Sequence, residues 1–157
     1  MRILAIDPGY ERMGVAIVEK DPRGKEVLLY SSCVTTPPKS DFSTRLLTLG
    51  RETERMIRTW KPAGMALEKV FFENNQKTAT SVAEVRGMLS YIAVKNSLTL
   101  YEYTPLQVKV AVTGYGKANK KQIETMVKTL IKLANEKRHD DEYDAIAIGL
   151  TCLASTR

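Results

Sequence analysis

The chain has 157 residues, a length that suits one globular domain. Hydrophobic residues make up 43% of the chain and charged residues 27%, which favours a folded chain with a buried core over a disordered one. No apolar run approaches the roughly 20 residues needed to cross a bilayer, and a charge with a Pro-Gly turn comes too early for a signal peptide. We therefore expect a single cytoplasmic domain spanning residues 1–157.

The first third of the sequence predicts a three-stranded antiparallel meander followed by a helix. Apolar runs at 2–6 and 14–18, and a third that starts at 27, alternate with strong turn sequences such as Asp7-Pro8-Gly9. Over residues 42–60 the apolar side chains recur at helical spacing, and Lys61-Pro62 ends this helix because proline resists continuation.

The rest of the chain alternates strands with helices. The segment 64–71 follows a helix, so we expect a strand parallel to the first one, reached by a right-handed crossover. Asn119 and Gln122 have the spacing of a capping box that opens a helix. The remaining predicted elements are helices at 76–95, 105–113, 119–133 and 141–153, and a strand at 99–103. This order predicts an α/β fold with a five-stranded mixed sheet flanked by helices.

The positive charge of the chain is concentrated in one segment. Residues 105–138 hold eight basic and two acidic side chains, so they account for the entire net charge of +6. A one-sided excess of this kind suits a partner with a phosphate backbone. A solvated, lysine-rich helix is the alternative interpretation.

Cysteine and histidine are scarce. Cys33 and Cys152 lie far apart without metal-ligand spacing, which predicts two small apolar core residues. His139 is the sole histidine, so triad chemistry built on histidine is restricted to that position and a zinc site is poorly supplied.

Two carboxylates are predicted on strands, Asp7 at the end of one and Glu68 within another, where a strand end facing solvent is the structural alternative for Glu68. Asp7 follows an apolar strand immediately before the Pro-Gly turn, where a role as turn former is the structural alternative. Glu68 interrupts an apolar segment that reads as a central strand, and glutamate is rarely buried there unless it is paired or binds a metal.

Two further acids begin the last helix. Asp141 and Asp144 are three residues apart, which places them on one helix face before a stretch that is apolar nearly all round. Capping of the helix N-terminus explains an acid at 140 or 141 but not at 144. Together the four carboxylates suit Mg²⁺ or Mn²⁺, and two such ions can promote an in-line displacement at phosphorus.

The chain resembles the RuvC family of Holliday-junction resolvases, essentially from end to end. The segments that carry the resemblance are 3–9, 66–71, 107–109, 114–116, 118–122 and 141–148. The resemblance implies a ribonuclease-H-like fold, a symmetric homodimer and Mg²⁺-dependent cutting of two strands of a four-way DNA junction. It also suggests the RuvA–RuvB branch-migration machinery as a partner.

The resemblance also implies roles for individual residues. Asp7, Glu68, Asp141 and Asp144 look like the acids that bind the metal and carry catalysis. The basic residues expected near the DNA are Lys109, Lys120 and Lys121. Phe71 falls where the family has an aromatic residue beside the junction bases, and packing in the core is the alternative for it.

The sequence departs from the family pattern just before the last pair of acids. The stretch 137–143 is about one residue longer than the small or proline-containing spacer that the resemblance leads us to expect there. Asp140 therefore competes with Asp141 as the third ligand, although the spacing from Asp144 favours Asp141. His139 could assist as a proton carrier.

Three alternative functions remain open at the level of sequence. The first is a nuclease of the same fold that acts on RNA, such as the YqgF-like relatives. The second is a phosphotransferase of the actin and sugar-kinase type, which would need two such domains. The third is a junction-binding protein without catalysis. The helix at 76–95 also has a second apolar face, including Ala83, Met88 and Tyr91, which is either a dimer surface or buried within one chain.

Overall fold

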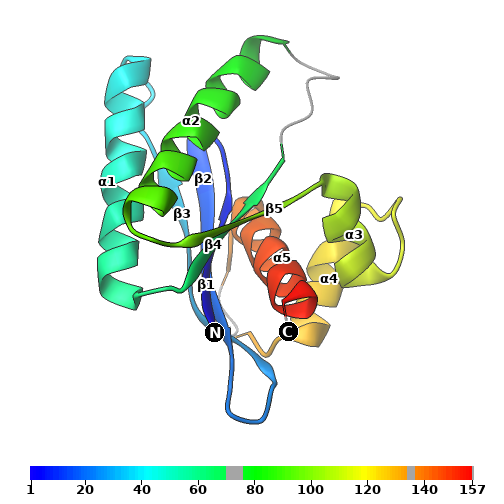
Figure 1. The fold of residues 1–157 in the computed structure, drawn as a ribbon. Helices are drawn as coiled ribbons and strands as arrows, with labels where there is room; N and C mark the ends of the chain where they lie inside the picture. Colours follow the sequence, from blue (N-terminus) through cyan, green and yellow to red (C-terminus); the bar gives the residue numbers. More distant parts are fainter. Residues whose placement is uncertain (70–75, 134–136, 157) are drawn as a thin grey trace.

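The computed structural model describes residues 1–69, 76–133 and 137–156 (Figure 1). The described strands are β1 (Arg2–Asp7), β2 (Arg12–Lys20), β3 (Glu26–Thr35), β4 (Gly64–Glu68) and β5 (Thr99–Tyr103). They form one sheet in the order β3-β2-β1-β4-β5. β1, β2 and β3 pair antiparallel, whereas β4 is parallel to β1 and β5 is parallel to β4. The predicted meander, the parallel crossover and the five-stranded mixed sheet are confirmed.

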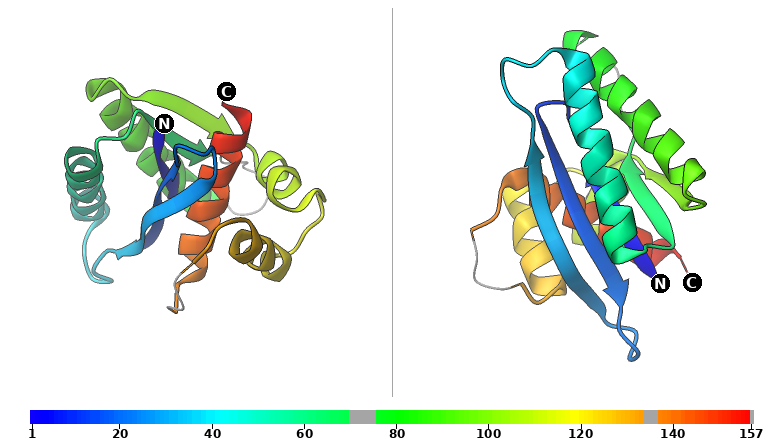
Figure 2. Two further views of the ribbon diagram at one scale, coloured as in Figure 1. Left: turned by 90° about the horizontal axis from the view of Figure 1, so that it is seen from below. Right: turned by 90° about the vertical axis from the view of Figure 1, so that its left-hand side faces the viewer.

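Helices cover both faces of the sheet (Figures 1 and 2). The described helices are α1 (Phe42–Trp60), α2 (Gln76–Lys95), α3 (Pro105–Thr113), α4 (Lys120–Leu130) and α5 (Asp140–Ser155). α1 and α2 lie on one face, and α5 lies on the other with α3 and α4 outside it. No helix in the described part of the chain is long and apolar enough to cross a membrane.

The alternation of side chains along the strands divides the core into two parts. Leu4 and Ile6 of β1 pack with α1 and α2, whereas Ile3 and Ala5 pack with α5. Asp7 continues the row that starts at Ile3 and Ala5, because side chains two residues apart share one face of a sheet. The end of β1 therefore presents its carboxylate to the face that α5 covers.

α5 is the central element of its layer. Its residues from Tyr143 to Leu153, Asp144 excepted, are buried on all sides, as its nearly continuous apolar sequence predicts. The helix starts very close to the sheet at Gly14, where an added Cβ atom would lie 1.8 Å from the carbonyl oxygen of Asp141. A glycine at this position of β2 is what allows the first turn of α5 to approach the sheet.

Several predicted boundaries need correction. The strand predicted over 64–71 ends at Glu68, because its partner β5 ends at Tyr103. The helix predicted over 119–133 ends at Leu130, and the next residue, Ile131, is extended and places its side chain in the core. The last helix is longer than predicted at both ends. The capping box of Asn119 and Gln122 is confirmed.

Candidate active site

Two of the predicted acids are brought together by strand register. Ile6 of β1 pairs with Leu67 of the parallel strand β4, so Asp7 and Glu68 follow at adjacent positions on neighbouring strands. Both side chains lie on the α5 face, at the carboxyl ends of the strands. In open α/β sheets this edge is where ligands bind.

The first turns of α5 bring the third acid to the same place. Asp144 is the largest charge contribution that raises the pKa of Asp7, ahead of Glu68 and then Asp141. Burial together with these negative neighbours raises the pKa of Asp7 to about 8. Burial and Asp144 raise the pKa of Glu68 to about 7. The carboxylates therefore repel one another in a partly desolvated space, which a cation would stabilise.

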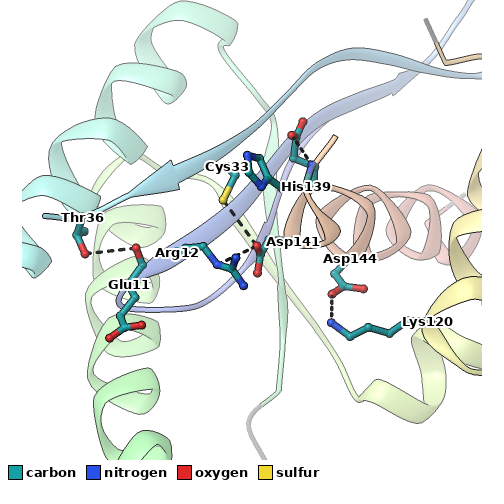
Figure 3. A network of polar contacts seen from close by, with 9 residues as sticks. Glu11, Arg12, Cys33, Thr36, Lys120, His139, Asp141 and Asp144 are labelled. Carbon is teal, nitrogen blue, oxygen red and sulfur yellow. Dashed lines mark hydrogen bonds and ion pairs between the residues drawn. The ribbon is translucent and has the colours of Figure 1, made fainter. Parts of the chain in front are cut away.

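Lysines partly offset this repulsion. Lys120 Nζ lies 3.3 Å from Asp144 Oδ2 (Figure 3). Burial raises the pKa of Asp144, and Lys120 opposes that rise. Lys109 lowers the pKa of Glu68 against the effect of burial and of Asp144. Both lysines thus stand within electrostatic reach of the acids.

These groups line one cleft of about 520 Å³ between α3, α4, α5 and the ends of β1 and β4. Its polar lining includes Asp7, Glu68, Lys109, Lys120 and Asp144. The structure therefore gathers three of the four predicted acids and two of the predicted basic residues in a single cleft.

The other two predicted DNA-binding residues are Lys121 and Phe71. Lys121 borders a neighbouring hollow together with Thr113 and Tyr115. Phe71 lies outside the described residues.

Asp141 is held to one side of the cleft. Its Oδ2 atom lies 3.3 Å from Arg12 Nε, and Cys33 Sγ donates to the same oxygen at 3.7 Å (Figure 3). Cys33 is therefore half-buried beside a carboxylate, which corrects the prediction that both cysteines are core residues. Cys152 is buried, as predicted.

Asp141 and Asp140 also differ in their exposure and in their electrostatic effects. Asp140 is exposed, whereas Asp141 is half-buried. The negative charge of Asp141 raises the pKa of Asp7. The charge of Asp140 raises the pKa of Asp144 and of Lys120. Burial and electrostatics thus favour Asp141 as the neighbour of Asp7.

The chemistry of the donors fits a hard divalent cation. All four acids offer carboxylate oxygens, which Mg²⁺ and Mn²⁺ prefer. The raised pKa values of Asp7 and Glu68 reflect first their burial and then the negative charge of neighbouring acids. Within the described ranges, however, no three acidic, histidine or cysteine side chains are already arranged around an ion position. Asp141 turns to Arg12 and Asp144 turns to Lys120, so cation binding requires these carboxylates to reorient.

Arg12 and Cys33 are neighbours of the site that sequence reasoning missed. Arg12 starts β2 and Cys33 lies on β3, where it pairs with Gly14. The available signal was the register of the meander, since Asp7 pairs with Gly14 and Gly14 pairs with Cys33. That register places Cys33 level with the end of β1, but it does not show which way Asp141 turns.

The sheet order, the carboxylates at the ends of β1 and β4 and the acidic start of α5 define a protein of the ribonuclease-H-like class. A family model described as crossover junction endodeoxyribonuclease RuvC matches residues 3–152. The chain belongs to this RuvC family.

Individual relatives agree over nearly the whole length. The protein of that name from Finegoldia magna is 41% identical over 150 residues, which cover 96% of this chain and 91% of the relative. The one from Alkaliphilus oremlandii is 42% identical over 156 residues, 99% of this chain and 94% of the relative.

Solved structures show the same fold. Thermus thermophilus RuvC in complex with Holliday junction substrate superposes with a TM-score of 0.88 at 29% identity, covering 96% of this chain and 92% of that one. The yeast mitochondrial Holliday junction resolvase has a TM-score of 0.72 at 14% identity, covering 97% of this chain and 77% of that one, and shows likeness of fold alone.

Proposed function

We propose that this chain is an endonuclease that resolves four-way (Holliday) DNA junctions by paired symmetric nicks, in homologous recombination and DNA repair. The observation that carries the proposal is the convergence of Asp7, Glu68 and Asp144 in one cleft with Lys109 and Lys120. Membership of the RuvC family, whose relatives are named crossover junction endodeoxyribonucleases, supports this choice among the reactions that such a cleft could serve.

In the proposed mechanism Asp7, Glu68, Asp144 and a reoriented Asp141 would hold Mg²⁺, or Mn²⁺ in its place, as two ions in the cleft. Such ions would supply activation of the attacking water and neutralisation of charge at the scissile phosphate. Lys120 exchanges its ion pair with Asp144 for a phosphate oxygen of the DNA. Lys109 adds a second positive charge to the lining of the cleft. Lys121 and Phe71 remain proposed DNA contacts.

We also propose that the protein works as a homodimer, because a junction with two-fold symmetry needs one site for each cut. α2 offers a surface for this contact. Tyr91 is 67% exposed and Val94 is 71% exposed on this helix. Of the second apolar face predicted for it, Tyr91 is thus exposed, whereas Met88 packs against the core. A RuvA–RuvB complex that presents the junction is the partner that the family resemblance suggests.

The proposal is tested with a synthetic four-way junction, incubated with and without Mg²⁺. Paired nicks at symmetric positions that need the ion are the expected result. Equal cutting of junction, linear duplex and RNA would instead indicate a general nuclease of the same fold. Binding of the junction without any cutting would indicate a non-catalytic junction-binding protein.

Four variants test the roles of the four acids, and a fifth variant serves as a control. Asp7→Asn, Glu68→Gln and Asp144→Asn should each abolish cutting while junction binding in metal-free buffer persists, because the amides keep the shape but not the charge. Asp140→Asn is the matched control, since Asp140 is exposed. Asp141→Asn should reduce cutting. If cutting were lost in Asp140→Asn and kept in Asp141→Asn, the assignment of the third ligand would be reversed.

A further inference from the structure

A second hollow borders a different face of α5 from the acidic cleft. It has a volume of about 740 Å³ and lies between β3 and the segments on either side of residues 134–136. Its basic lining residues are Lys132, Lys137, Arg138 and His139. We propose that this hollow binds backbone phosphates of the DNA arm next to the cut. The inference rests on the proposed function and adds a binding site to it.

The two lysines of the hollow are available to a ligand. Lys132 and Lys137 are both exposed. In the described part of the chain, no carboxylate lies within ion-pair distance of either ammonium group. An ammonium group without a carboxylate partner can bind a phosphate without first breaking an ion pair.

The acidic group in the lining is already satisfied by the protein. Glu142 is buried, and its Oε2 atom accepts a hydrogen bond from Ser31 Oγ at 2.6 Å. Its Oε1 atom accepts one from the backbone N–H of His139 at 3.1 Å. These two donors hold the carboxylate in place, so it does not need either lysine as a hydrogen-bond partner.

The same hydrogen bonds orient a third cation. Arg138 Nε donates to Ser31 Oγ at 3.2 Å, and Ser31 in turn donates to Glu142. This chain of contacts fixes the guanidinium against β3 within the lining of the hollow. Among the described residues of the lining, the two lysines without a carboxylate partner thus stand beside one satisfied carboxylate, which suits a polyanion.

The position of the hollow points to DNA as its occupant. Cys33 lines the hollow and donates to Asp141, so the hollow begins beside the acids. From Cys33 it follows the edge strand β3 as far as Leu28, a length of roughly 17 Å at the rise of a strand. That length matches roughly five nucleotides of duplex along its axis. A DNA strand cut in the acidic cleft can therefore continue into the hollow.

The proposal also accounts for the stretch 137–139. Lys137 and Arg138 are consecutive basic residues, and neither lines the acidic cleft. A phosphate site gives this charge a function.

The test compares two pairs of lysines. A double variant that combines Lys132→Ala and Lys137→Ala should weaken binding of a four-way junction in metal-free buffer. It should also reduce the slope of log affinity against log salt by about 1 to 2, because each lost phosphate contact is worth roughly 0.9. Lys25→Ala with Lys39→Ala removes the same charge from exposed positions elsewhere and should leave the slope unchanged. Equal effects of both pairs would overturn the inference.

Neutral methylphosphonates locate the contact. When placed one at a time along the arm next to the cut, they should weaken binding by the wild-type protein at a few adjacent positions. At those positions the methylphosphonates should not further weaken binding by the double variant of Lys132 and Lys137. Failure of the wild-type protein to bind or cut junctions would contradict the proposed function. Normal cutting by the wild type, together with unchanged junction affinity of the double variant, would contradict only the phosphate site.

Discussion

Asp7 shows how one side chain couples the site to the stability of the fold. Its carboxylate lies at the end of a buried strand, close to Glu68, Asp141 and Asp144, and its pKa is raised from 3.8 to about 8. The folded chain therefore keeps a proton that the unfolded chain releases above about pH 4. Stability should fall as the pH rises from about 4 toward about 8, because ionisation of Asp7 lowers the free energy of the unfolded chain over this range while the folded chain keeps the proton.

This pH effect is the first prediction. In the presence of a chelator, the melting temperature of the wild-type protein should fall between about pH 5 and about pH 8. Asp7→Asn should show a smaller fall, because its amide carries no charge at any of these pH values. Addition of Mg²⁺ at about pH 8 should raise the melting temperature of the wild type more than that of the variant. Parallel pH profiles for the two proteins would show that Asp7 is not the group responsible.

Arg12 sets the resting position of Asp141. The ion pair joins an exposed guanidinium to a half-buried carboxylate at 3.3 Å, and an exposed pair of this kind contributes about 0.2–1 kcal/mol. Since the carboxylate must leave Arg12 to face Asp7, the pair opposes cation binding by that amount.

Arg12→Ala should therefore bind Mn²⁺ a few-fold more tightly than the wild type, measured by titration calorimetry without DNA. Arg23→Ala removes an exposed arginine from the turn between β2 and β3 and is the matched control. Unchanged or weaker binding by Arg12→Ala would show that the ion pair does not restrain Asp141.

Among the elements, β2 and α5 determine the geometry of the acidic helix end. Gly14 leaves room for the carbonyl of Asp141, which a Cβ atom would approach to 1.8 Å. A backbone atom cannot yield as the end of a flexible side chain can. Any side chain at this position must push the first turn of α5, with Asp141 and Asp144, away from Asp7.

Gly14→Ala should therefore reduce cutting strongly and lower the free energy of unfolding by about 1–3 kcal/mol, the usual range for overpacking. Urea denaturation and cleavage rates measure the two effects. Gly50→Ala is the control, because its Cβ would meet the flexible Met88 Sδ at 3.1 Å, far along the chain from the acids. It should keep the wild-type cleavage rate. Normal cutting by Gly14→Ala would mean that the first turn of α5 does not need this close approach.

The sequence predicted most elements because local signals agreed with the fold. Asp41 caps α1 and Lys61 ends it in a left-handed conformation, so its bounds match the prediction. The end of α4 was missed because a tertiary contact decides it: Ile131 leaves the helix to bury its side chain. The orientation of Asp141 was missed for the same reason, since Arg12 reaches it from another strand.

At the scale of the whole molecule, the positive charge divides into two regions on either side of α5. Lys109 and Lys120 stand in the acidic cleft, and Lys132 and Lys137 stand at the second hollow. The excess of charge in residues 105–138 is thus distributed around the acids rather than along one solvated helix face.

The proposed dimer gives the last prediction. Tyr91→Lys with Val94→Lys should convert the protein to a monomer in light scattering, because two ammonium groups would be buried on each side of the contact. Leu130→Lys replaces another exposed apolar residue, 42% exposed at the end of α4, and should leave the dimer intact. A dimer that survives the α2 substitutions must use another surface.

The position of α5 in the chain has a consequence for synthesis of the protein. Asp7 and Glu68 are in place once β1 and β4 have paired, but Asp144 belongs to the final helix. A chain that is still emerging from the ribosome therefore lacks part of its proposed cutting apparatus until the first turns of α5 have been added. Chains that stop before α5 should for this reason be unable to cut DNA, without a separate inhibitor.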